Sequence, residues 1–136
     1  MQVATDSERE RIALGHEVDW SHTSVVKFER LPVADARTLL DEGYVDPQAR
    51  VGDSPTMVEI LAFCERWSAE SPQTDGETSL HGRVVAPEDP ETGVYFEGVR
   101  YTGPTSAEFV RAFADTFATA QSFMLEKDLH ARCWFR

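Results

Sequence analysis

The side chains best suited to chemistry alternate along three late segments of the chain, residues 80–86, 94–101 and 129–135. These segments carry β-branched and aromatic residues and are bounded by turn residues, which is typical of strands. Because successive side chains of a strand point to opposite faces, one face gathers arginine, histidine and aromatic residues around a carboxylate. We predict a ligand site or interface on this face, with the candidates His81, Arg83, Tyr95, Glu97, Tyr101, His130, Arg132 and Trp134.

Three interpretations of this face stay open. Of the two functional interpretations, self-association or binding of a protein partner comes first, because arginine and aromatic side chains anchor interfaces. A pocket for an anionic or aromatic small molecule, or an enzyme on the same face, comes second, with Arg83 and Arg132 binding the anion and a histidine transferring protons. The third interpretation is structural, and in it Arg83 or Arg132 only neutralises Glu97 while the rings shield the sheet.

The opposite face of the three segments is apolar and predicts the core. Its members are Leu80, Val84, Ala86, Val94, Phe96, Leu129, Ala131, Cys133 and Phe135. The same alternation puts Val85, Val99 and Arg136 beside the candidate residues. Because a slip of one residue exchanges the two faces of a strand, every one of these assignments depends on register.

Other motifs give little support for catalysis or for a metal. His16, Asp19 and His22 lie close in sequence, but their spacing matches no zinc signature, so surface histidines and no metal site are expected. The chain has no phosphate-binding loop, dinucleotide-binding glycine motif or nucleophile elbow, and no cofactor is expected.

The two cysteines, Cys64 and Cys133, are far apart and lie among apolar residues. Pairing of Cys64 with His81 would give a nucleophile and a base, but Cys64 sits on the apolar stripe of a predicted helix. We therefore predict buried structural thiols.

Composition bounds the remaining functions. The chain has 136 residues and a formal net charge of −11, so its field should repel nucleic acid and anionic lipid headgroups. No apolar run is long enough to cross a bilayer, and residues 1–10 are polar, so a cytoplasmic location is expected. The acidic residues are interpreted as a solvated surface. The bias in amino-acid composition fits either salt adaptation or a GC-rich genome.

The elements that position these side chains follow from periodicity and punctuation. A short helix is predicted between Pro32 and Gly43, and a second from Ser54, as its N-cap, to about Glu70. A hairpin with an acidic tip follows. A long helix with a capping box at 105–108 then carries apolar residues from Phe109 to Met124 and polar ones as far as Lys127.

The whole chain, 1–136, is predicted to be one α+β domain: a small antiparallel sheet of three or four strands with about three helices packed on one face. Residues 1–24 are treated as an irregular or loosely packed segment, in which 8–14 could form a short helix. Residues 24–28 could form a further strand.

Overall fold

Five antiparallel strands form one sheet in the order β1-β2-β3-β5-β4 within the described part of the chain. The computed structural model describes residues 2–70, 77–102, 106–120, 122–126 and 130–135. The α+β class and the antiparallel sheet are confirmed, and β1 and β4 extend the predicted sheet to five strands. The strands are β1 (Val25–Pro32), β2 (Glu77–Val85), β3 (Gly93–Thr102), β4 (Ser122–Glu126) and β5 (His130–Trp134).

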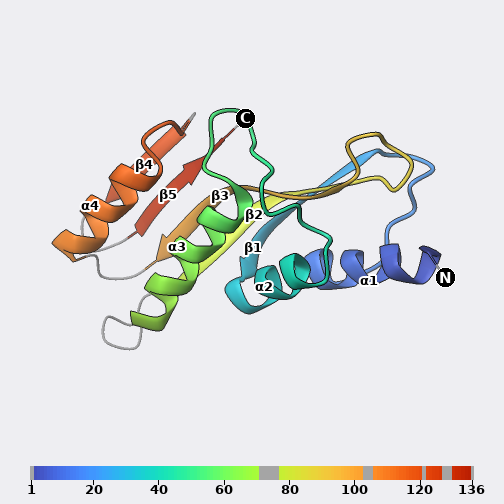
Figure 1. Ribbon diagram of the computed structural model, residues 1–136, viewed down its shortest axis with the longest axis horizontal. Helices are drawn as coiled ribbons and strands as arrows, with labels where there is room; N and C mark the ends of the chain where they lie inside the picture. Colours follow the sequence, from blue (N-terminus) through green and yellow to red (C-terminus); the bar gives the residue numbers. More distant parts are fainter. Residues whose placement is uncertain (1, 71–76, 103–105, 121, 127–129, 136) are drawn as a thin grey trace.

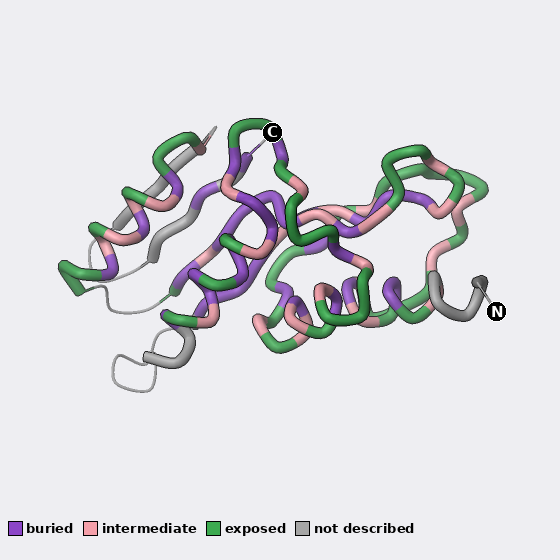
Figure 2. The backbone as a smooth tube through the Cα atoms, viewed as in Figure 1, coloured by how far each residue is buried: buried purple, intermediate pink, exposed green. Residues whose placement is uncertain are grey.

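Helices cover one face of this sheet (Figure 1). In the described residues they are α1 (Gln2–Leu14), α2 (Val33–Asp41), α3 (Met57–Glu70) and α4 (Ala107–Thr116). Helix α3 contacts β2 and β3, α2 contacts β1 and β2, and α1 packs beside α2. Figure 2 shows the buried residues along the strands and on the helix turns that face them. Within the described residues, every helix is too short or too polar to span a bilayer.

An aromatic cluster between α3, α4 and the sheet forms part of the core. The ring of Phe63 lies 4.9 Å from that of Phe117 and 5.9 Å from that of Phe113, measured between centroids. Tyr101 of β3 stacks on Phe109 of α4 at 4.2 Å. The part of the predicted apolar stripe from Phe109 to Phe117 is therefore buried against α3 and the sheet, as its helical spacing indicated.

Helix ends agree with the capping signals only in part. Helix α2 follows Pro32, and Gly43 has a φ of 86° just beyond its end, as predicted. Helix α3 begins at Met57 rather than at Pro55, because Thr56 and Glu59 cap each other: the Thr56 amide donates to Glu59 Oε1 at 2.9 Å, and the Glu59 amide donates to Thr56 Oγ1 at 3.3 Å.

The fourth helix is shorter than predicted. Ser106 caps it by accepting a hydrogen bond from the Phe109 amide at 3.0 Å, and Thr105, the predicted cap, lies outside the described residues. The helix ends at Thr116, and residues 122–126 form β4 instead of its last turns. Strand β4 pairs with β5, so that its backbone groups are satisfied by a sheet ladder instead of by a helix.

Two bulges interrupt the sheet beside the same residue of β2. In β3, Phe96 pairs with Gly82 and Gly98 pairs with His81, so Glu97 is an extra residue. The backbone groups at this bulge are satisfied, since the Phe96 amide donates to the Met57 sulfur at 3.2 Å and the Phe135 amide donates to the Glu97 carbonyl at 2.6 Å. In β1, Phe28 pairs with Gly82, and the register shifts before Leu31.

The bulge in β3 corrects one predicted site residue. Tyr101 was expected on the candidate face, beside Val99, but both are buried in the core, with 3% and 0% of their surface exposed. The extra residue at Glu97 exchanges the two faces of the strand, so Tyr95 lies on one side and Val99 and Tyr101 on the other.

Candidate functional site

The face of the sheet opposite the helices, called the outer face below, carries the side chains that could bind a ligand. From the described residues it presents Lys27 of β1, Ser79, His81 and Arg83 of β2, and Tyr95, Glu97 and Arg100 of β3. The helices cover the other face, so no helix in the described part of the chain lies over these residues (Figure 1). This open, polar face contains two distinct groups of side chains.

The first group is an ion-pair cluster centred on Glu97, whose surface is only 7% exposed. Lys27 Nζ lies 2.8 and 3.0 Å from its two carboxylate oxygens, and Arg83 donates to Oε2 at 2.8 Å. The Arg83 guanidinium also lies 4.9 Å from the centroid of the Tyr95 ring. A buried carboxylate needs such partners, so this cluster fits the structural interpretation, in which Arg83 neutralises Glu97.

The second group lines a pocket of about 230 Å³ at the other end of the β2–β3 pair. Its walls are Arg30 of β1, Ser79 of β2, and Arg100 and Thr102 of β3, and we call it the arginine pocket. Ser79 and Arg100 are directly paired across the two strands. The pocket therefore combines two guanidinium groups with two hydroxyls and has no carboxylate among its lining residues.

Arg30 reaches this pocket because of the bulge in β1. Phe28 and Leu31 are both buried, at 5% and 3% exposure, although strict alternation would place residues three apart on opposite faces. The intervening Arg30 has a φ of 58°, a left-handed conformation that costs a residue with a side chain about 1 kcal/mol or more. Burial of the two flanking side chains holds the strained backbone in place.

The two arginines of the pocket differ from Arg83, the other described arginine of the outer face, in having no carboxylate partner. Arg83 forms a salt bridge with Glu97. Among the described residues, the side chains of Arg30 and Arg100 form neither a hydrogen bond nor an ion pair. Two unneutralised guanidinium groups lining one pocket repel each other, and a bound anion would relieve that repulsion.

The other predicted site residues are His81 of β2 and three residues of β5. His81 lies between the two bulges, and its imidazole sits where a β-carbon on Gly98 would be. The backbone of β5 pairs Trp134 with Gly98, Arg132 with Arg100 and His130 with Thr102. The side chains of those three β5 residues lie outside the described part of the structure.

Four residues of the outer face and the arginine pocket were not predicted from the sequence: Lys27, Arg30, Ser79 and Arg100. A signal for the last of these was present: the apolar residues of β3 fall at 94 and 96 and then at 99 and 101, a change of phase that indicates a bulge. In β1 the spacing of Phe28 and Leu31 is a similar change of phase beside Arg30, but neither change shows which strand will lie alongside.

His16 and His22, for which no metal site was predicted, are both exposed. His22 Nε2 lies 4.0 Å from Asp19 Oδ2, both residues are exposed, and His16 Nδ1 lies 2.9 Å from the Glu17 carbonyl oxygen. No group of three potential metal ligands occurs among the described residues.

Cys64 and Cys133 are free and buried, as predicted for structural thiols. Burial raises the pKa of the Cys64 thiol well above its ordinary value and that of Cys133 to about 12.

These thiols are expected to react slowly in the folded protein. A raised pKa lowers the fraction of thiolate, the reactive form, at any given pH, and burial excludes the reagent. Alkylation by iodoacetamide at mildly alkaline pH, followed by mass spectrometry, should be at least about tenfold slower for the folded chain than for the urea-unfolded chain. An Ala118→Cys variant supplies an exposed thiol as the control, and equal rates at all three cysteines would show that the native core is open.

Comparison of the chain with protein-family models, with curated proteins and with solved structures found no match in any of the three.

Proposed function

We propose that this protein is a binding module whose arginine pocket takes a small anionic ligand bearing a phosphate or carboxylate group. The observation that carries the proposal is the pair of guanidinium groups, Arg30 and Arg100, that line one pocket without a carboxylate among its walls. In a chain with a formal net charge of −11, carboxylates are abundant, and most positive groups could find one nearby. A pocket that keeps two arginines unneutralised is suited to an external anion.

The chemistry of the pocket favours an oxyanion. Each guanidinium offers a planar set of N–H donors that matches two oxygens of a phosphate or carboxylate, and Ser79 and Thr102 add hydroxyl donors. Drug-sized ligands occupy pockets of roughly 300–1,000 Å³, so about 230 Å³ fits a small group better. The field of the acidic chain lowers the affinity for anions in general, which leaves recognition to these local donors.

Self-association through the outer face is the competing proposal. The face is free of covering helices, and arginine with aromatic side chains suits an interface (Figure 1). A two-fold contact centred on the arginine pocket would, however, bring Arg30 and Arg100 of the two copies close together, which is unfavourable without bound anions. Light scattering over a concentration series distinguishes the two: a monomer at all concentrations contradicts self-association and leaves anion binding intact.

Removal of either arginine should weaken phosphate binding. We expect isothermal titration calorimetry with inorganic phosphate in a low-salt buffer to show about tenfold weaker binding for Arg100→Ala and for Arg30→Gly, since a charge-assisted hydrogen bond contributes about 1.5–3 kcal/mol. The glycine variant also relieves the left-handed backbone at position 30, so it loses the guanidinium without loss of stability.

The matched control is Arg111→Ala, which removes the same charge from the exposed side of α4. Its phosphate affinity should stay within about twofold of the wild type, because only the general field changes. Equal weakening in all three variants would assign the effect to net charge, and phosphate that fails to bind the wild type at millimolar concentration would overturn the proposal.

A further inference from the structure

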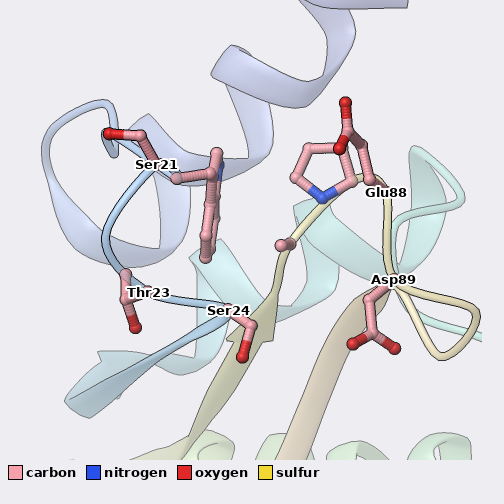
Figure 3. Close-up of a pocket in the computed structure, with 8 residues that line it drawn as sticks. Ser21, Thr23, Ser24, Glu88 and Asp89 are labelled. Atoms are coloured by element: carbon pink, nitrogen blue, oxygen red, sulfur yellow. The ribbon is translucent and has the colours of Figure 1, made fainter.

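A second, larger pocket of about 490 Å³ lies at the opposite end of β1 and β2 from the arginine pocket. One wall is the segment before β1, with Trp20, Ser21, Thr23 and Ser24. The other wall is the connection after β2, with Ala86, Pro87, Glu88 and Asp89. Figure 3 shows the labelled members of these two segments on either side of the pocket. The Ala86 amide donates to the Ser24 carbonyl at 2.9 Å and joins the two segments.

Trp20, Ser21 and Thr23 present acceptors to this pocket because their side-chain donors are already engaged, whereas the Ser24 hydroxyl has no hydrogen bond within the described residues. The Ser21 hydroxyl donates to Asp19 at 2.6 Å, and the Thr23 hydroxyl donates to the Val25 carbonyl at 2.9 Å. The indole N–H of Trp20 donates to Glu10 at 2.9 Å. What these groups can still offer a ligand is lone pairs and the π-surface of the ring.

The charge of the pocket has the same sign throughout. Glu88 and Asp89 supply two carboxylates, and no lysine, arginine or histidine lines the pocket. The nearby cation Arg9 is directed elsewhere, since its guanidinium donates to the Val85 carbonyl at 2.7 Å and to Thr92 at 3.2 Å. A ligand here meets carboxylates, hydroxyl lone pairs and an aromatic ring, which is the set that recognises an organic ammonium group.

The aromatic wall is held in place from inside the molecule. Glu10 of α1 is 3% exposed, and its second oxygen accepts the Val18 amide at 2.7 Å, so one buried carboxylate fixes both the backbone and the indole of the 18–20 segment. Trp20 is half-buried, which leaves part of its ring accessible. A pre-positioned ring reduces the ordering cost of binding.

From this arrangement we infer that the pocket between residues 20–24 and 86–89 binds a small organic cation with ammonium N–H donors, such as a linear diamine. The inference is independent of the proposed anion site, because the two pockets lie at opposite ends of the β1–β2 pair and select opposite charges. One ammonium would lie against the Trp20 ring, and Glu88 or Asp89 would accept its hydrogen bonds.

The test compares 1,4-diaminobutane with the neutral diol 1,4-butanediol by calorimetry, with the Trp20 indole N–H signal in nuclear magnetic resonance spectra as a local readout. We expect the diamine to bind and to shift that signal, and the diol to do neither. Trp20→Leu and Glu88→Gln should each weaken diamine binding about fivefold, the size expected for a cation–π contact or a partly exposed ion pair.

Glu91→Gln is the matched control, because this exposed acid of the same connection does not line the pocket. It should leave the diamine affinity within about twofold of the wild type. Thermal unfolding of each variant shows whether the fold is kept, and Glu88→Gln, at an exposed position, tests the site even if Trp20→Leu unfolds. Equal weakening by Glu91→Gln, equal binding of the diol, or no binding of the diamine would each overturn the inference.

Discussion

Replacing Gly98 with alanine is expected to lower the free energy of unfolding by about 3 kcal/mol, because overpacking against backbone cannot be relieved by a side-chain rotation. A β-carbon at this position would collide with the carbonyl oxygen of Cys133 in β5 and with the imidazole of His81 in β2. Strand β5 would have to move away from β3 beside the bulge, where the Phe135 amide donates to the Glu97 carbonyl. Urea denaturation followed by circular dichroism measures the change.

Arg100→Ala is the control for this experiment. It lies two residues further along β3, on the outer face and without a partner among the described residues, so its unfolding free energy should change by no more than about 0.5 kcal/mol. The comparison also shows that this variant is folded when its phosphate binding is measured. A Gly98→Ala protein as stable as the wild type would mean that β3 and β5 do not approach as closely as described.

Removal of the Glu97 carboxylate should have the second largest effect. The Glu97→Ala variant leaves Lys27 and Arg83 facing each other without a counter-charge, and we expect a loss of about 2 kcal/mol. This is less than for a fully buried pair, because the side chains of Lys27 and Arg83 are 65% and 27% exposed and water screens their repulsion. Denaturation at low and high salt measures the loss, which should shrink as salt rises.

Glu29→Ala provides the comparison, since Glu29 is an exposed carboxylate of β1 without an ion pair among the described residues. Its removal should change stability by about 0.5 kcal/mol or less. If Glu97→Ala and Glu29→Ala behave alike, the cluster contributes nothing to the fold, and the outer face would be held by the strand ladders alone.

Some elements were predicted correctly from the sequence and others were not, and particular residues show the physical reason. Pro32 and Gly43 bracket α2 as predicted, because capping depends on a few adjacent residues. The helix predicted as far as Lys127 ends at Thr116, because residues 122–126 have a strand partner that lies outside any local window. Pairing of Arg83 with Glu97 was among the alternatives, since both lie in one hairpin.

The arginine pocket was beyond prediction. Arg30 and Arg100 are seventy positions apart in number and occupy β1 and β3, which do not pair directly but flank β2. Arg30 and Arg100 line one pocket because of the β1–β2 and β2–β3 registers and the bulge in each pair. Neither the registers nor the bulges change the local composition of the sequence. The phase change between Phe96 and Val99 could have revealed the bulge in β3, but not the strand that would lie beside it.

The sequence by itself determined the fold class, the apolar stripes of the helices and the inward or outward direction of residues 80–84 and 94–97. These properties depend on the periodicity of a single segment. Only the tertiary structure decided that Tyr101 is core, that Lys27 and Arg83 neutralise Glu97, and that Arg30 joins Arg100. The reason is that a charge finds its partner through the register between strands, and register is set by the packing of the whole sheet against its helices.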